Sequence, residues 1–213
     1  MNEKQYQSLC GWAARTSARQ KCLTACFRLL PVLFVFLYGI GSVCALSALV
    51  QKQVGLWIAA FWAIPAAGFL LVTLIRKKLN RPRPAQLFHF VPLVQHEDGC
   101  SFPSRHTSSA FLITCALFWL CRYTALPAVF PLIAAVSAVL TALSRVVAGV
   151  HFPRDVIAGA AFGIGFSVFL QSTLLMIRRN LSPRSISDVA IAGPSFAVNT
   201  RRVGSSRFPI DNG

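Results

Sequence analysis

The sequence predicts an all-α fold, a polytopic bundle of transmembrane helices with five clear spans. Apolar residues make up 55% of the chain, and its mean hydropathy of +0.59 is well above that of a soluble domain. These residues are gathered into long runs, of which 29–50 and 54–75 hold 22 residues each. A helix of that length measures about 33 Å and crosses a hydrocarbon core of about 30 Å.

The composition also limits the partners of the protein. The chain holds 21 Lys and Arg against 6 Asp and Glu, a net charge of +15. Such a charge alone fits nucleic acid, anionic lipid or a phosphorylated substrate. The apolar content predicts a membrane protein and argues against nucleic acid, so the location of the charge must decide between lipid and substrate, and the oligomeric state is left open. The 7 cysteines show no metal-ligand or disulfide spacing, and we expect neither a metal nor disulfides.

The N-terminal segment, residues 1–28, is interpreted as a basic region that can form an interfacial helix. Its cations are scattered among small and apolar residues: Lys4, Arg15, Arg19, Lys21 and Arg28. No short apolar core of the signal-peptide type follows it. The spans 29–50 and 54–75 come next, separated by three polar residues, and are expected to form an antiparallel hairpin.

The second half of the chain begins with a polar, Pro-rich segment, 76–106, which is too long for a simple connector and is expected to carry function. Three shorter predicted spans follow it, at 107–121, 126–143 and 156–177. The predicted membrane domain therefore covers 29–177. The tail, 178–213, is basic and rich in Ser, Pro and Gly, and we expect it to be disordered.

Five crossings would place the segment 76–106 and the region around 144–155 on the same side of the membrane. The N-terminus would share that side, and the C-terminal tail would lie opposite. The remaining basic residues are divided almost evenly between the two sides, so the positive-inside rule does not decide the orientation. The polar segments of the two regions can therefore meet.

A polar cluster stands between two of the apolar runs and consists of Ser144, Arg145, His151 and Asp155. A charged residue in a membrane segment costs about 2.5 to 3.5 kcal/mol, so such a cluster indicates a functional site. Two further polar groups can join it, at 76–84 and 103–106. Because guanidinium groups bind phosphate oxygens bidentately and neutralise their charge, this set of residues is suited to a phosphate.

The two histidines suggest a division of labour, because displacing an oxygen from phosphorus needs a nucleophile and a proton donor. His151 and His106 can fill these roles, and Asp155 can orient one ring nitrogen of His151. Ser104 is expected to begin a helix, where its hydroxyl and the first backbone N–H groups would attract an anion. Pro153 is typical of the first turn of the next helix.

On these residues the chain resembles the type 2 phosphatidic acid phosphatases, which share their motifs with vanadium haloperoxidases. The family pattern is a lysine, six residues and Arg-Pro; then Pro-Ser, often Gly, and His; then Ser-Arg, five residues, His, three residues and Asp. The third motif matches at every defined position. Two departures occur, because Arg76 stands where the family has lysine and Arg105 replaces the frequent glycine.

The resemblance assigns roles residue by residue. It implies that His151 is the nucleophile that forms a phosphohistidine, with Asp155 as its partner and His106 as the general acid. It implies phosphate ligands at Arg83, Ser104, Arg145 and the backbone N–H of Arg105. Arg76 keeps the charge of the family lysine but not its shape, and Lys77 is an alternative for that role.

The resemblance further implies a cell-membrane lipid phosphatase that needs no metal or other cofactor. Its substrate would be a lipid phosphomonoester or pyrophosphate. A polyprenyl pyrophosphate such as undecaprenyl pyrophosphate is favoured, with phosphatidic acid and phosphatidylglycerol phosphate as alternatives. The same resemblance places the active site on the extracytoplasmic side.

Two other functions remain open. A lipid phosphotransferase would pass the phosphoryl group from His151 to an acceptor other than water. A non-catalytic lipid-binding or transport protein would use the cations only as an anion site, but would not need His106 and His151 together. The remaining loop residues His89, His96, Glu97 and Asp98 lack motif partners and are interpreted as ordinary loop residues.

Overall fold

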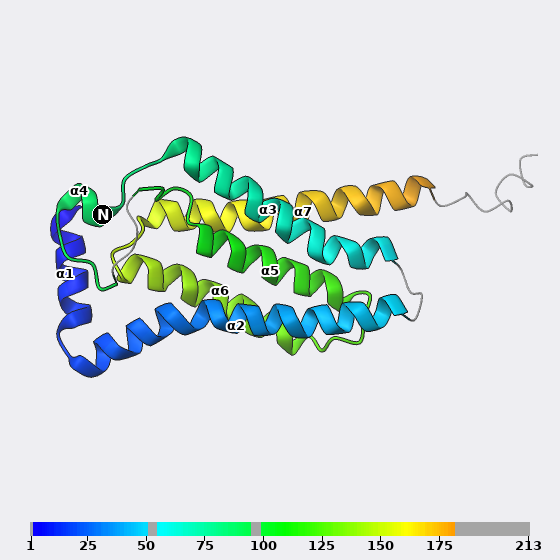
Figure 1. Cartoon of the computed structure of the whole chain (residues 1–213), viewed down its shortest axis with the longest axis horizontal. Helices are drawn as coiled ribbons and strands as arrows, with labels where there is room; N and C mark the ends of the chain where they lie inside the picture. The colour runs from blue at the N-terminus through cyan, green and yellow to red at the C-terminus, as the bar shows by residue number, and fades with distance from the viewer. Residues whose placement is uncertain (1, 51–54, 95–98, 182–213) are drawn as a thin grey trace, which may run out of the picture. The chain divides into compact units, whose positions relative to one another are not determined.

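The computed structural model describes residues 2–50, 55–94 and 99–181, without the side chains of 179–181 (Figure 1). The chain forms two compact units, Met1–Leu175 and Met176–Gly213. Several predictions fall outside the described residues: the turn at 51–53, the loop residues His96, Glu97 and Asp98, and the tail from 182 onward. All regular secondary structure in the described part is helical, which confirms the predicted fold class.

The helices follow the predicted order with shifted ends. Two residues set starting points as expected, because α5 begins directly after Ser104 and α7 begins at Pro153. The helices are α1 (Glu3–Ala14), α2 (Ser17–Val50), α3 (Gly55–Leu79), α4 (Pro84–Phe88), α5 (Arg105–Cys121), α6 (Val129–Val147) and α7 (Pro153–Leu181).

The count of five spans needs correction. Among the described residues, four helical segments are long and apolar enough to cross a membrane: Ser17–Val50, Gly55–Phe88, Val129–Val147 and Pro153–Arg178. They make the chain a multi-pass membrane protein. The exception is α5, whose 17 residues measure only about 25 Å. It contacts α2, α3 and α6, so its apolar residues are largely covered by protein.

The N-terminal segment is divided between two helices. Asn2 and Gln5 form a capping box that begins α1. Within the first unit α1 lies across one end of the bundle (Figure 1) and contacts α2 and α6. The second helix begins at Ser17, so it runs through the predicted boundary between 28 and 29. Only α1 is therefore separate from the first span.

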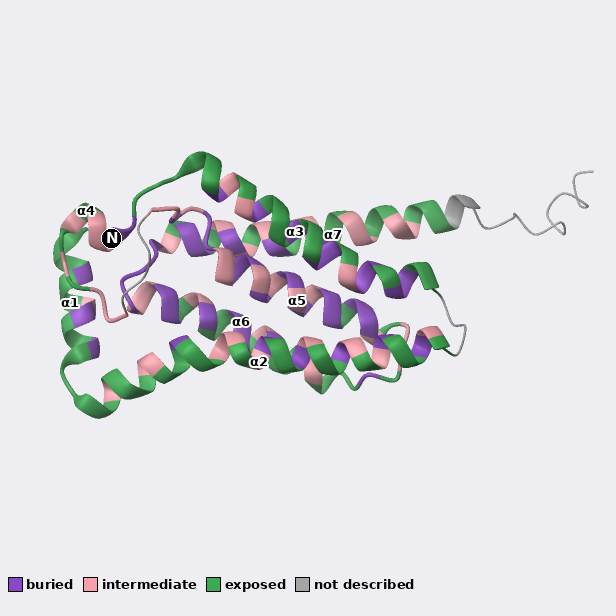
Figure 2. Cartoon of the chain, in the orientation of Figure 1, coloured by how far each residue is buried: buried purple, intermediate pink, exposed green. Residues whose placement is uncertain are grey.

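The core lies between α2, α3, α5 and α6, where Figure 2 shows the buried faces turned toward neighbouring helices. Phe34, Phe61, Leu117 and Ala138 are among its members. Large apolar side chains cover much of the opposite faces, and Val35 on α2 is 71% exposed. Exposed apolar faces of this extent mark a surface that contacts lipid.

Candidate active site

The turn between α6 and α7 places the residues of the third motif. Gly149 has a φ of +74°, and a Cβ at this position would lie 2.8 Å from Phe90 Cε2. The turn therefore requires glycine both for its backbone conformation and for space. It leaves Arg145 in the last turn of α6 and His151 two residues before α7.

His151 and Asp155 lie side by side in a buried site. The histidine is 1% exposed, and its Nδ1 lies 3.7 Å from Asp155 Oδ2. The same carboxylate oxygen accepts hydrogen bonds from Ser101 Oγ at 2.5 Å and from the Phe152 N–H at 3.1 Å. Because Nδ1 faces the carboxylate, Nε2 is the ring nitrogen that remains for attack on phosphorus.

The protonation state of His151 suits a nucleophile. Burial lowers its pKa from the ordinary 6.5 to about 4, and the positive charges of Arg83 and Arg76 act in the same direction. The hydrogen bond and charge of Asp155 oppose this shift without cancelling it. His151 is therefore neutral at pH 7, with a lone pair available on the ring.

The lowered pKa of His151 predicts a pH dependence of folding stability. As pH falls from 6.5 to about 4, His151 becomes protonated in the unfolded chain but stays neutral in the folded chain. The folded state should lose about 3 kcal/mol over this window, and the loss should be absent above pH 6.5. Thermal unfolding of wild type and His151→Gln in detergent checks this. As pH falls, the Tm of the variant should rise relative to that of wild type, because the variant lacks the group whose protonation destabilises the fold.

The matched control for that experiment is His89→Gln, because His89 is exposed and should not change the pH dependence. A constant difference in Tm between wild type and His151→Gln from pH 7 to pH 4 would contradict the lowered pKa.

Two predicted phosphate ligands flank the histidine. Arg83 donates from Nε to Gly99 O at 3.1 Å and from Nη1 to Val150 O at 3.3 Å. Arg145 is 1% exposed, donates from Nη2 to Phe27 O at 3.3 Å, and stacks on the Phe27 ring at 3.7 Å.

The Nε of Arg145 is buried and has no hydrogen-bond partner among the described groups. A buried charged N–H without a partner is costly. A phosphate oxygen would satisfy this donor, which makes Arg145 suited to bind a phosphoryl group.

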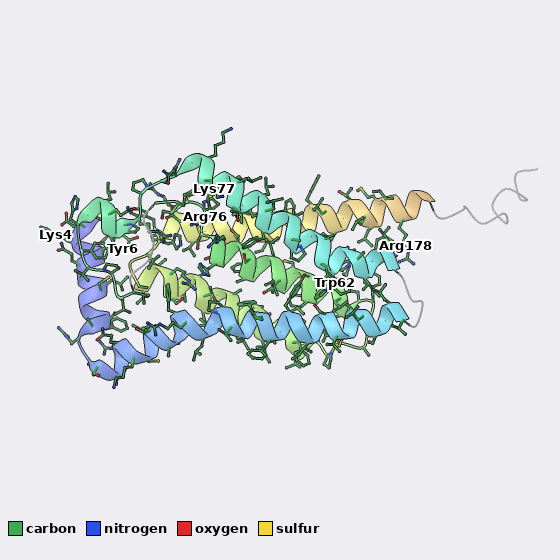
Figure 3. The ribbon with its side chains drawn as sticks, viewed as in Figure 1. Lys4, Tyr6, Trp62, Arg76, Lys77 and Arg178 are labelled. Atoms are coloured by element: carbon green, nitrogen blue, oxygen red, sulfur yellow. The ribbon has the colours of Figure 1, made fainter. Side chains whose placement is uncertain are left out.

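The structure separates the two candidates for the first motif position. Arg76 is 7% exposed, and its Nη1 donates to Pro103 O at 2.7 Å, directly before Ser104. Lys77 is exposed, and Figure 3 labels both residues near the C-terminal end of α3. The helix thus brings Arg76 to the site and leaves Lys77 outside it.

This difference predicts unequal effects of substitution. Arg76→Ala should lower kcat/KM for a lipid phosphate by about 100-fold, the usual cost of removing one preorganised donor to a transition-state oxyanion. Lys77→Ala should stay within about twofold, because exposed cations contribute little. Phosphate release from both purified variants measures this. Comparable losses in the two variants would contradict the placement of Arg76.

The start of α5 carries the second motif. Ser104 is fully buried, its N–H donates to Asp155 O at 2.9 Å, and its hydroxyl accepts from Thr107 Oγ1 at 3.0 Å. The hydroxyl does not cap the helix, in contrast to the usual role of an N-cap serine. A Cβ at Gly159 would lie 2.8 Å from Ser104 O, so glycine permits this close approach of α5 and α7.

His106 is half-buried in the first turn of α5, near the backbone N–H groups that a helix start leaves free for an anion. Arg105 lies beside it, with its guanidinium 5.8 Å from the Phe69 ring on α3.

Sequence reasoning missed three residues that support the site. Ser101 donates to Asp155 and lies 3.4 Å from His151 Nδ1. Gln86 Oε1 accepts from the N–H groups of Arg83 and Gly99, both at 3.0 Å. Tyr6, on α1, donates from its hydroxyl to His151 O in the turn between α6 and α7. No spacing in the sequence distinguishes these residues from other polar residues, because each acts through a contact with a distant segment.

Comparison with known proteins links the sequence that carries this site to one family. The family model of the PAP2 superfamily matches residues 55–179. The lipid A 1-phosphatase of Rhizobium johnstonii is 35% identical over 121 residues, which are 53% of this chain and 46% of that protein. The undecaprenyl-diphosphatase BcrC of Bacillus subtilis is 34% identical over 111 residues, 51% of this chain and 54% of BcrC.

The chain thus spans about half the length of these curated relatives. A solved structure, the crystal structure of Aquifex aeolicus LpxE, is 27% identical with a TM-score of 0.48, covering 67% of this chain and 85% of that one.

Proposed function

The chain belongs to the PAP2 superfamily, and from this we propose that it is an integral membrane lipid phosphatase acting through a phosphohistidine. The observation that carries the proposal is the neutral, buried His151 held against Asp155 at 3.7 Å, with Arg83 and Arg76 close enough for their positive charges to lower its pKa. A non-catalytic anion site would not need this histidine, so the arrangement favours an enzyme.

The proposed reaction has two steps. In the first, His151 Nε2 attacks phosphorus, the bond from phosphorus to the leaving oxygen breaks, and His106 gives that oxygen a proton. In the second, His106 takes a proton from water, the water oxygen attacks phosphorus, and the bond to Nε2 breaks to release inorganic phosphate. Arg76, Arg83 and Arg145 would neutralise the phosphoryl oxygens in both steps, a task that metal ions perform in other phosphatases.

The favoured substrate is a polyprenyl pyrophosphate such as undecaprenyl pyrophosphate. One relative of similar identity is named an undecaprenyl-diphosphatase and another a lipid A 1-phosphatase, so both lipid classes belong among the candidates. Phosphatidic acid and phosphatidylglycerol phosphate complete the set. We also propose that the site faces the extracytoplasmic side, as the family resemblance implies.

The position of α1 supports the proposed interfacial location of the N-terminal segment. This helix lies across the end of the bundle near the site (Figure 1). Lys4 is exposed on it, and Trp12 is 49% exposed with the Arg19 guanidinium 4.3 Å from its ring. Tryptophan and basic residues commonly occupy the boundary between lipid and water.

The test is phosphate release by the purified full chain from a panel of these lipids in detergent micelles, with no added acceptor. Release from at least one lipid, inhibition by vanadate and activity in the presence of EDTA are expected. Activity that appears only with an alcohol acceptor would indicate a phosphotransferase. Lipid binding without turnover of any substrate would indicate a non-catalytic protein and contradict the proposal.

A further inference from the structure

Hydrogen bonds hold the backbone on either side of His151, and four of them involve His151 itself or the facing groups of its two neighbours. The His151 N–H donates to Arg145 O at 3.3 Å, and the preceding carbonyl, Val150 O, accepts from Arg83 at 3.3 Å. The following N–H, that of Phe152, donates to Asp155 at 3.1 Å. These three contacts come from motif residues. The fourth does not, because the carbonyl of His151 itself accepts from Tyr6 OH at 3.2 Å.

Tyr6 is held firmly enough to fix that carbonyl. Its side chain is 0% exposed, and it packs against three aromatic rings at 5.7 to 6.0 Å, those of Phe88, Phe90 and Phe152. Burial, together with the negative charge of Asp155, raises the pKa of Tyr6, so the phenol remains a donor. Figure 3 shows Tyr6 on α1 at the end of the bundle that carries the site.

The rest of α1 supports the same turn. Cys10 Sγ lies 4.0 Å from Val147 O, and it would lie 3.1 Å from a Cβ at Gly149. The turn therefore packs against α1 along its length. Since α1 lies outside the residues that match the family model, 55–179, this support is added by the N-terminal segment.

We propose that Tyr6 is a positioning residue for the nucleophile, because its hydroxyl fixes the backbone of His151 and so the direction of the imidazole toward phosphorus. The inference rests on the proposed phosphatase function. Tyr6 would act on the orientation of the nucleophile and therefore on the rate of the chemical step. Substrate binding would depend instead on the arginines. Tyr6 should therefore affect kcat more than KM.

The test is Tyr6→Phe, which removes one oxygen and keeps the ring among its aromatic neighbours. The kcat for lipid phosphate hydrolysis should fall about five- to tenfold, the usual effect of losing one hydrogen bond, with KM within twofold. Hydrogen–deuterium exchange of the amides in 148–152 should become faster. A kcat within twofold of wild type, or unchanged exchange in this turn, would overturn the proposal.

The matched control is Tyr38→Phe. The hydroxyl of Tyr38 also donates to a backbone carbonyl, that of Phe61, at 3.2 Å, but between α2 and α3 in the core. Both variants should lower Tm by similar amounts, while Tyr38→Phe keeps kcat and the exchange of 148–152 unchanged. Equal losses of kcat in the two variants would mean that Tyr6 only stabilises the fold, and would overturn the inference. If wild type hydrolyses no lipid of the panel, the proposed function fails and the exchange comparison alone decides the role of Tyr6.

Discussion

Replacing His151 with alanine is expected to lower lipid phosphate hydrolysis by at least about 10⁴-fold, because the covalent step loses its nucleophile. The cations that bind phosphate remain, and a Cβ still fills part of the buried site. Substrate binding should therefore survive while turnover is lost. The measurements are phosphate release and the trapping of an acid-labile phosphoenzyme from radiolabelled substrate, which should form in wild type and not in His151→Ala.

The control for this prediction is His89→Ala. His89 is the C-cap residue after α4, with a φ of +50°, and it is exposed, so its loss should leave hydrolysis within twofold of wild type. A labelled phosphoenzyme in His151→Ala, or more than a tenth of wild-type activity, would rule out His151 as the nucleophile.

The second large effect is expected for Asp155→Asn, with a fall in kcat of about 10² to 10⁴-fold. The carboxamide has nearly the same shape and keeps one oxygen for the Ser101 hydroxyl or the Phe152 N–H. In the wild type, the carboxylate 3.7 Å from His151 Nδ1 stabilises positive charge on the ring when Nε2 becomes phosphorylated. The substitution removes this negative charge. Single-turnover formation of the phosphoenzyme should slow as much as kcat.

Arg154→Ala is the control at the same carboxylate. Arg154 Nε lies 3.8 Å from Asp155 Oδ1, but the Arg154 side chain is 64% exposed, so water screens this pair. Its loss should change kcat by less than about threefold. If Asp155→Asn keeps more than a tenth of wild-type kcat, the carboxylate does not orient or stabilise the nucleophile.

Much of the fold could be predicted because the hydrophobic effect acts on runs of side chains that are contiguous in the sequence. The runs 29–50 and 54–75 correspond to α2 and α3, and the start of α7 at Pro153 was predicted from the fixed φ of proline. The helix ends were harder to predict. Polar residues such as Ser17 and Arg76 continue the helices beyond the apolar runs, because helical hydrogen bonds do not require apolar side chains.

The number of spans was wrong for a related reason. Apolar composition does not distinguish a helix that contacts lipid from one that is covered by other helices. The apolar residues of α5 are covered by α2, α3 and α6, so its sequence resembles that of a span. Its length, set by Ser104 at one end and the turn after Cys121 at the other, is short for a span.

What the sequence by itself determined is the membrane class, the family and the third motif. His151 and Asp155 are four residues apart at a helix start, so the local chain keeps them close in space. The tertiary structure decided which residues reach them. The helical phase of α3 buries Arg76 and exposes Lys77, and the approach of α5 to α7 at Gly159 brings Ser101 to Asp155. Tyr6, 145 residues before His151, meets it only because α1 lies across the end of the bundle. Contacts between distant segments depend on packing geometry, which residue types and their spacing do not encode locally.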